Sequence, residues 1–421
     1  MKKRAIGTSR NQGTRIVEQR QLRLAAVVER NLYEFVIREG MKALDTILEQ
    51  DRELMCGPRH QRGAAHEAVR WGTTEGRLAM GGRRVIVRRP RARKDGHEVE
   101  LPSWSQFADE DPLDERTMEQ MVLGVSTRNY KRSLEELPDE LGAHGDSKSA
   151  ASRRFVAATQ ENLDAWLKRT LSELKLAVVM IDGIEVAEHV VIVALGIDEN
   201  GQKHLLGLWQ GATENAAVCE ALLNDLVARG LDAQQSYLFV IDGSKALRKA
   251  IREIFGSRGI VQRCQVHKTR NVLDHLPKSL HTSVGKTMHD AYRSSSKQTA
   301  RKCLQNLAAQ LEQDYPDAAA SLREGLEETI TLKDWKMPVW LERTLSTTNA
   351  IENLNSAIRR VTRNVKRWRD GSMIKRWVAT AIFEAQRGFR RLRGHKGLPD
   401  LVRAFRSAEQ TTRIDQGDHA A

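Results

Sequence analysis

The stretch Leu176–Leu195, LAVVMIDGIEVAEHVVIVAL, contains the longest run that reads as buried β-strand. Its first apolar segment leads directly into Asp182, and a second covers 190–195. A carboxylate among core strand residues is costly to bury unless it is paired, hydrogen-bonded or bound to a metal, so Asp182 is a candidate site residue. Taken alone, Asp182-Gly183 is better interpreted as a tight turn between two strands, because Asp-Gly is a strong turn signal.

Strand and helix patterns alternate downstream of this stretch. After a third strand, the sequence predicts a helix at 216–229, a strand at 237–241, a helix at 244–255 and a strand at 260–262. Three antiparallel strands followed by helix–strand units predict a mixed α/β sheet. Asp242 follows the fourth strand, where α/β sheets place their sites, although Asp242-Gly243-Ser244 is also interpretable as a turn that Ser244 caps.

A long helical stretch, about 267–332, precedes a further helix at 349–363 that has two faces. Asn349, Glu352 and Asn355 form a polar stripe opposite an apolar one. Glu352 is interpretable as a third site carboxylate. Equally, Asn349 as N-cap with Glu352 three residues later would form a capping box, which explains the glutamate without catalysis.

The N-terminal part combines helices with one β-hairpin. Helical spacing of apolar residues covers 14–50, with a break near Gly40. Two strands, 84–89 and 98–101, flank an Asp-Gly turn and predict a basic hairpin on which Arg84 and Arg88 contact DNA phosphates.

Residues 111–160 predict a helix-turn-helix. Helices at 116–123, 127–137 and 148–159 are separated by Gly124 and by a glycine-bearing linker. Because the N-terminal part of the last helix of such a unit enters the major groove, the expected DNA-contacting residues are Lys148, Ser149, Ser152 and Arg153.

The positive charge is clustered. The formal net charge is +13, and residues 76–94 hold eight Lys or Arg and no acid. Residues 359–396 hold thirteen Lys or Arg against two acids. Such clusters are typical of DNA-backbone binding rather than of a merely solvated surface. In the second cluster the expected phosphate contacts are Arg359, Arg360, Arg363, Lys366 and Arg367.

Composition also bears on the compartment. The four cysteines are widely spread, which favours a reducing compartment without a disulfide framework. No apolar run approaches the roughly 20 residues that span a bilayer, and no secretory signal follows Met1. We therefore expect a cytoplasmic, nucleoid-associated protein without a membrane partner.

Taken together, Asp182, Asp242 and Glu352 indicate a metal site, because converging carboxylates suit Mg²⁺ or Mn²⁺. Such ions activate a nucleophile for attack on a phosphodiester. Long motifs surround them: VVMIDGIEV, FVIDGSKALRKAI, QRCQVHKTRNVL and TTNAIENLNSAIRR, preceded by MVLGVSTRNYKRSLEEL and GDSKSAASRR. By their order and spacing, the chain over about 32–405 resembles the mutator-type bacterial insertion-sequence transposases, whose catalytic domain is RNase H-like with a DDE triad.

This resemblance implies that Asp182, Asp242 and Glu352 hold Mg²⁺ or Mn²⁺, and that a helical insertion fills the long interval before Glu352. His267, in the C-x-x-H pair with Cys264, would orient a scissile phosphate. The alternative is a buried cysteine beside a hydrogen-bonded histidine, and zinc is not expected because no second ligand pair is present.

The resemblance further implies a transposase that binds terminal inverted repeats, cleaves DNA and transfers the strand to target DNA as a homodimer or larger assembly. The alternatives are a catalytically silent, transposase-derived DNA-binding protein, and a related nuclease that cuts without joining. The expected domains are N-terminal helices with the basic β-hairpin (1–110), a helix-turn-helix region (111–165), an RNase H-like core (170–267), a helical insertion (268–345) and the last part of the core with basic C-terminal helices (346–410).

Overall fold

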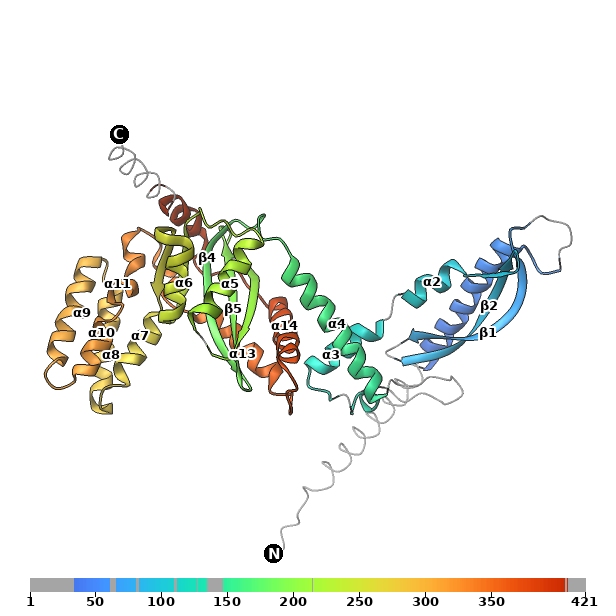
Figure 1. Ribbon diagram of the computed structural model, residues 1–421, viewed down its shortest axis with the longest axis horizontal. Coiled ribbons are helices and arrows are strands. Elements are labelled where there is room, and N and C mark those ends of the chain that lie inside the picture. Colours follow the sequence, from blue (N-terminus) through green and yellow to red (C-terminus); the bar gives the residue numbers. More distant parts are fainter. Residues whose placement is uncertain are drawn as a thin grey trace, which may run out of the picture. The chain divides into compact units, whose positions relative to one another are not determined.

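The computed structural model describes residues 34–60, 66–80, 83–109, 112–126, 128–134, 147–213, 215–405 and 407. The chain divides into two compact units, Met1–Ala158 and Thr159–Ala421 (Figure 1). Over the described residues, no helix has the length and apolar character needed to cross a membrane. The expected helical segment before residue 34 lies outside the described residues.

In the first unit, a helix over 34–56 lies against a three-stranded antiparallel sheet. The strands are β1 (Val69–Met80), β2 (Arg83–Lys94) and β3 (His97–Val99). Leu44 and Leu48 of the helix share a core with Leu78 of β1. The expected break near Gly40 is wrong, because the helix continues through it. A glycine costs a helix only about 1 kcal/mol relative to alanine, and this packing outweighs that cost.

The turn between β2 and β3 is formed by Asp95 and Gly96, which both have positive φ (52° and 80°). A two-residue hairpin turn of this type requires such values. Arg84 and Arg88 are exposed on β2. The sequence did not predict β1, the longest partner of β2, because two glycines interrupt its alternation. One of them, Gly76, is packed so closely that a Cβ would lie 2.1 Å from the Trp104 ring.

Short helices connect this sheet to a long one. They are α2 (Pro102–Asp109), α3 (Pro112–Val122), the 3₁₀ turn η1 (Lys131–Ser133) and α4 (Lys148–Lys168). The predicted helix at 127–137 is wrong over 128–134, which form turns and η1. There the Ser133 hydroxyl donates to the Tyr130 carbonyl (2.6 Å), a local bond that competes with helix formation. The remainder of that prediction lies outside the described residues.

The start of α4 follows expectation. The Ser147 hydroxyl accepts a hydrogen bond from the Ala150 amide (3.2 Å), as an N-cap does. The side chains predicted to contact DNA lie on this first part of the helix. Three of them, Lys148, Ser149 and Arg153, are exposed, and Ser152 is half-buried.

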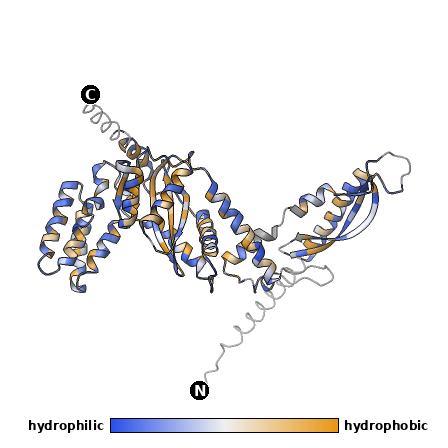
Figure 2. Ribbon diagram, viewed as in Figure 1, coloured by the Kyte–Doolittle hydropathy of each residue, from blue (hydrophilic) through white to orange (hydrophobic). Residues whose placement is uncertain are grey.

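The second unit is built on a five-stranded mixed sheet with strand order β6-β5-β4-β7-β8. Its strands are β4 (Leu176–Val186), β5 (His189–Asp198), β6 (Lys203–Gly211), β7 (Tyr237–Ile241) and β8 (Gly259–Arg263). The first three in the chain pair antiparallel, whereas β7 pairs parallel with both β4 and β8. Figure 2 shows how apolar β4 and β5 are. The predicted mixed α/β sheet is therefore confirmed.

The interpretation of Asp182-Gly183 as a turn is wrong. Both residues lie within β4, where Asp182 pairs with Val193 of β5. The reversal comes after Val186, at Ala187, which takes a positive φ of 55°. The apolar residues flanking Asp182 on both strands prolong the ladder past the Asp-Gly pair, so burial overrides the local turn signal.

Helices cover both faces of this sheet. Val179 and Ile181 of β4 pack in one cluster with α5 (Ala216–Ala228) and α6 (Lys245–Phe255). Because alternate side chains of a strand point to opposite faces, Asp182 belongs to the other face. On that side β4 contacts α13 (Asn349–Thr362), and β6 contacts α14 (Gly371–Arg387).

Between β8 and α13 the chain is helical, as predicted. The helices are α7 (Gln265–Leu273), α8 (Lys278–Arg293), α9 (Lys297–Leu311), α10 (Pro316–Arg323), α11 (Leu326–Thr329) and α12 (Val339–Leu345). They enclose a separate apolar core that includes Met288, Leu304 and Leu322. Buried Lys268 of α7 donates to the carbonyl of Glu324, and burial lowers its pKa to about 8. Arg263 of β8 donates to the same carbonyl (2.9 Å). This carbonyl, at the end of α10, therefore binds one cation from α7 and one from the sheet.

The aromatic packing of β7 gives a test of the sheet core. Phe239 is fully buried, with its ring centroid 5.0 Å from that of Phe255. We expect Phe239→Ala to lower the free energy of unfolding by about 3–5 kcal/mol, measured by urea denaturation. Val339→Ala, at a position that is 60% exposed, is the control and should change it by less than about 0.5 kcal/mol. Equal effects of the two substitutions would contradict this packing.

Candidate active site

The register of the parallel strands carries Asp182 and Asp242 toward the same end of the sheet. Val178 of β4 pairs with Leu238 of β7, and Met180 pairs with Val240. Asp182 lies two residues beyond Met180 on β4, and Asp242 directly follows the end of β7. The amide of Cys264, which directly follows β8, donates to the carbonyl of Ile241 (2.7 Å). Asp242 and Cys264 thus lie at the edge of the sheet formed by the carboxyl ends of β7 and β8, toward which β4 carries Asp182.

Helix α13 is held over this edge by Asn355. Its Nδ2 donates to Oδ2 of Asp182 (2.7 Å), while Oδ1 of Asp182 accepts from the Gly183 amide (3.0 Å). Asn355 is 1% exposed. Glu352 lies one helical turn before it on α13; among the described residues, the potential metal ligands that gather with Glu352 within 4.8 Å are Cys264 and His267, and neither aspartate is in that group. The sequence indicated Asn355 only as part of a polar stripe. Its partner, far away in the chain, leaves no local signal.

Asp242 combines the two interpretations that the sequence left open. Its Oδ1 accepts from the Ser244 amide (2.9 Å), and Ser244 caps α6. Gly243 between them has φ of 115°, and a Cβ there would lie 2.2 Å from Nε of Arg263. The segment is therefore a strand-to-helix turn that also presents a half-buried carboxylate at the edge of the sheet.

Glu352 is not part of a capping box. The N-cap of α13 is Thr348, which makes no side-chain cap bond, and Asn349 is already the first helical residue. Instead, the Thr348 hydroxyl donates to Oε1 of Glu352 (2.5 Å). The same hydroxyl lies 3.3 Å from Nδ1 of His267 and 3.4 Å from Sγ of Cys264. Sequence reasoning missed Thr348, because two of its three partners, Cys264 and His267, come from a distant segment.

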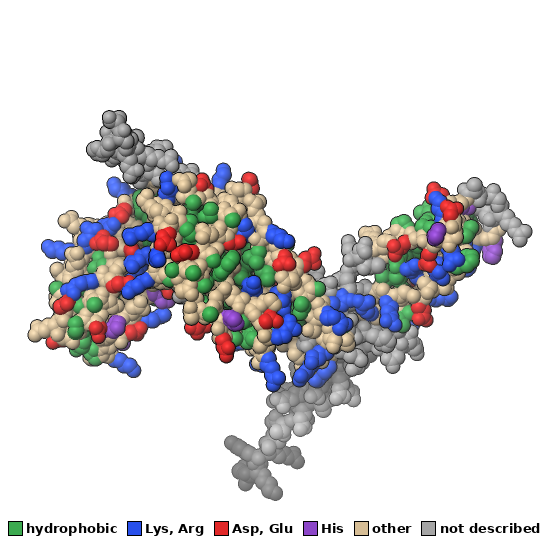
Figure 3. Space-filling view, in the orientation of Figure 1, with side chains coloured by type: hydrophobic (Ala, Val, Ile, Leu, Met, Phe, Trp, Pro, Cys, Tyr) green, Lys and Arg blue, Asp and Glu red, His purple; other side chains and the backbone are tan. Residues whose placement is uncertain are grey.

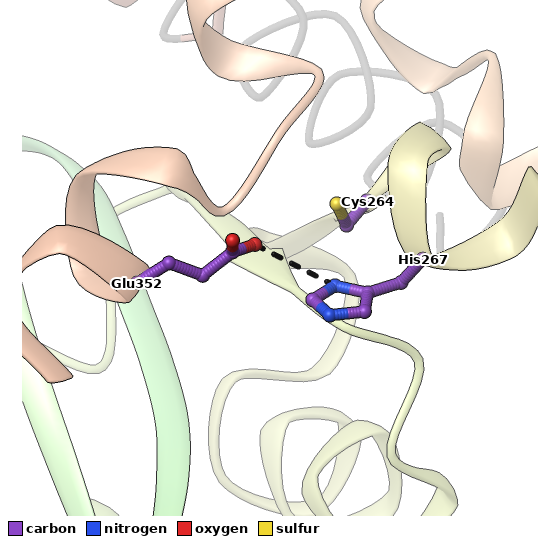
Figure 4. Close-up of side chains that lie close together, drawn as sticks. All are labelled: Cys264, His267 and Glu352. Atoms are coloured by element: carbon purple, nitrogen blue, oxygen red, sulfur yellow. Dashed lines mark ion pairs between the residues drawn. The ribbon is translucent and has the colours of Figure 1, made fainter. Parts of the chain in front are cut away.

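Cys264, His267 and Glu352 point toward one another (Figure 4). Their ligand atoms all lie within 4.8 Å of one another, and Nδ1 of His267 is 3.8 Å from Oε1 of Glu352. Three such atoms match the number of protein ligands in catalytic zinc sites. The Thr348 hydroxyl lies within hydrogen-bonding range of all three side chains.

Charges at this edge alter the two titrating groups of the C-x-x-H pair. The hydrogen bond with Cys264 raises the pKa of His267 against the effect of burial, and the charges of Glu352 and Asp242 add to the increase. Burial acts to raise the pKa of Cys264, but hydrogen bonds with His267 and Thr348 outweigh it and lower that pKa. Of the two carboxylates, Glu352 is in direct range of the ring, with its Oε1 3.8 Å from Nδ1 of His267.

Removal of the Glu352 charge should therefore lower the pKa of His267. We expect Glu352→Gln to give this shift in an NMR titration of the imidazole, with Glu384→Gln on α14 as the control. Because the folded pKa lies above the ordinary value of 6.5, protonated His267 stabilises the fold fully below pH 6.5. That contribution is lost as the pH rises through the raised pKa. Equal pKa values in both variants would show that Glu352 does not act on this ring.

The predicted phosphate contacts of the second basic cluster extend from the end of α13 toward α14. All five are exposed, and none has an ion pair among the residues that the structure describes: Arg359, Arg360, Arg363, Lys366 and Arg367. Figure 3 shows Lys and Arg side chains interspersed with Asp and Glu over the face in view. Since Glu352 and Arg359 share α13, the helix that carries the third candidate carboxylate also begins the basic segment.

Comparison with known proteins gives a consistent set of relatives. The model of the family described as Transposase, Mutator family, matches residues 11–391. The transposase for insertion sequence element ISRM3 of Rhizobium meliloti (strain 1021) is 30% identical over 331 residues, covering 76% of this chain and 77% of the relative. The transposase for insertion sequence element IS905 of Lactococcus lactis subsp. lactis (strain IL1403) is 28% identical over 305 residues, or 70% and 74% of the two chains.

A third relative extends the range of hosts. The transposase for insertion sequence element IS256 in transposon Tn4001 of Staphylococcus aureus is 26% identical over 309 residues, covering 70% of this chain and 75% of the relative. The family match spans the sheet, the helices between β8 and α13, and most of the first unit. The chain therefore belongs to the Mutator family of transposases.

Proposed function

We propose that this transposase binds the terminal inverted repeats of its insertion sequence and catalyses metal-dependent DNA strand cleavage and strand transfer at Asp182, Asp242 and Glu352. The observation that carries the proposal is the bond from Asn355 to Asp182, which holds α13, the helix that carries Glu352, against β4, the strand that carries Asp182. The sheet order, with three antiparallel strands followed by two parallel ones, supports an RNase H-like core.

The donor set fits a hard divalent cation. Asp182, Asp242 and Glu352 are half-buried carboxylates, and oxygen ligands of this kind suit Mg²⁺ or Mn²⁺. These three residues would hold the ions. Bound divalent ions activate a water molecule or a 3′-hydroxyl for in-line attack on a phosphodiester. The Asn355 amide and the Thr348 hydroxyl fix the orientation of two of these carboxylates before any ion binds.

His267 supplies a positive charge beside the acids. Its raised pKa favours the imidazolium, which can donate to a phosphate oxygen of the scissile bond. The exposed arginines and lysines from Arg359 to Arg367 would hold the DNA backbone next to this site, and Lys148, Ser149, Ser152 and Arg153 on α4 would contact base edges in the repeats.

Loss of one carboxylate should separate binding from chemistry. We expect wild-type protein to nick repeat-end DNA in the presence of Mg²⁺. Asp242→Asn should bind the same DNA with little change but cut at least about 100-fold more slowly, because it weakens the binding of the ions that stabilise charge at the reacting phosphate. Asp314→Asn, at an exposed position before α10, is the control and should cut normally. If Asp242→Asn cuts as fast as wild type, the assigned triad is incorrect.

Two assays distinguish the proposal from its rivals. A catalytically silent, DNA-binding relative would bind repeat ends without nicking them at any Mg²⁺ or Mn²⁺ concentration. A nuclease of the same fold would nick but would give no joined product from pre-nicked ends in a strand-transfer assay. The proposed transposase gives both products.

Salt dependence tests the basic segment. Removal of one side chain that binds a phosphate should reduce the slope of log K against log [salt] by about 0.9 for duplex DNA. We therefore expect the triple change Arg359→Ala, Arg363→Ala and Arg367→Ala to make the slope shallower by about 3, measured by fluorescence anisotropy. Arg301→Ala, which removes a cation already paired with Glu327, is the control and should leave the slope unchanged. Equal slopes for wild type and the triple variant would exclude this segment as a DNA-binding surface.

A further inference from the structure

A cavity of about 1030 Å³ lies beside the carboxylate site, between α7, α8 and the segment 333–347. Gln265 and Val266 on its wall lie between Cys264 and His267 in the chain, and Ser346 and Thr347 directly precede Thr348. The Gln265 amide donates to the Ser346 carbonyl (2.9 Å), which ties these two parts of the wall together. The cavity and the proposed catalytic residues therefore share one wall.

The wall opposite is built around a buried cation. The Lys333 side chain is 4% exposed, and its Nζ donates to the Ser294 carbonyl (2.5 Å) and to Glu342 (2.8 Å). These bonds join the end of α8 to α12. Two acids line the cavity, Asp274 and Glu342. The charge of Glu342 is neutralised by its ion pair with Lys333.

The cavity lining as a whole is basic. It holds five Lys or Arg side chains and two acids, and these counts include Lys333 and Glu342. Arg270, Arg293 and Lys336 are exposed, and over the described ranges none of the three has an ion pair. Cations that converge on a concavity without acidic partners favour an anionic ligand. The positions of the three, on α7, α8 and the segment before α12, surround the cavity rather than forming one surface stripe.

The lining also offers apolar surface. Val266 is 44% exposed and Val339 is 60% exposed, and Leu273 and Met337 also line the cavity. A duplex hides the faces of its bases by stacking, whereas the volume of this cavity is near the upper end of small-ligand sites, about 300–1,000 Å³. Single-stranded nucleic acid presents phosphates and base faces together, and its binding grooves combine cations with apolar or aromatic surface.

We infer that this cavity binds a short single-stranded segment of DNA that continues from the phosphodiester held at the carboxylate site. The inference rests on the proposed function, since it assigns the strand to the DNA that the three acids would cut. Arg270, Arg293 and Lys336 contact its phosphates, and the apolar wall contacts its bases. The cavity thus takes the strand after it separates from its complement.

The test uses the full chain with Ca²⁺ in place of Mg²⁺, so that DNA binds without being cut. The probe is an oligothymidine of about 12 nucleotides, within the usual site size for such grooves, that carries photoreactive 4-thiothymine. We expect its cross-links to map by mass spectrometry to peptides of α8 and of residues 333–347. Cross-links confined to other segments, or suppressed equally by a duplex competitor, would overturn the inference.

Matched variants give the second measurement. The triple change Arg270→Ala, Arg293→Ala and Lys336→Ala should abolish these cross-links and make the salt slope for the oligothymidine shallower by about 2, because each phosphate bound on a single strand adds about 0.7 to that slope. The control triple Lys278→Ala, Lys286→Ala and Lys302→Ala removes the same charge from exposed positions outside the cavity lining, and should leave both readouts unchanged. Equal effects of the two triples would overturn the inference.

Failure of this inference is distinguishable from failure of the proposed function. If wild type nicks repeat ends in Mg²⁺ but the cross-links lie elsewhere, the cavity assignment alone is wrong. If the cross-links map to the cavity but neither wild type nor Asp242→Asn nicks DNA, the strand-binding site stands and the catalytic proposal fails.

Discussion

The hydrogen bond from Asn355 to Asp182 is the contact on which the site depends. It joins β4, the first strand of this sheet along the chain, to α13. The rest of the sheet and the whole helical insertion lie between these two elements in the sequence. Parallel pairing of β4 with β7 carries both aspartates toward the same end of the sheet, but nothing in the sheet itself supplies Glu352. A buried amide that donates to a carboxylate is a short, directional contact, and breaking it leaves two polar groups unsatisfied. The third acid therefore has a defined place before any ligand binds.

The insertion leaves this arrangement undisturbed because it is stabilised separately. Its helices have their own apolar core, which contains no residue of the sheet. Their attachment is polar and local: Arg263 at the end of β8 and Lys268 on α7 both donate to the Glu324 carbonyl. The path of the chain can thus leave the sheet after β8 and return at α13 without displacing the edge at which the carboxylates lie.

Much of the second unit was predictable because its signals are local. The apolar run of β7, the N-cap of α6 and the helical spacing of the insertion are all confirmed. The errors arose where local signals met long-range contacts. Asp182-Gly183 resembles a turn until β5 pairs with it, and Glu352 resembles half of a capping box until Thr348 takes the cap position. Thr348 and Asn355 were missed as site residues because Cys264 and Asp182, which they contact, are far away in the chain.

Gly243 shows how strictly geometry alone can limit evolutionary drift. Its φ of 115° and the Arg263 guanidinium beside it leave no room for even a methyl group, and a strained backbone adds about 1–3 kcal/mol for any other residue. The glycine codon is therefore fixed by the shape of the turn, whichever DNA ends the protein recognises. Copies of such an element that diverge in their target sequences should still carry glycine immediately after the second aspartate.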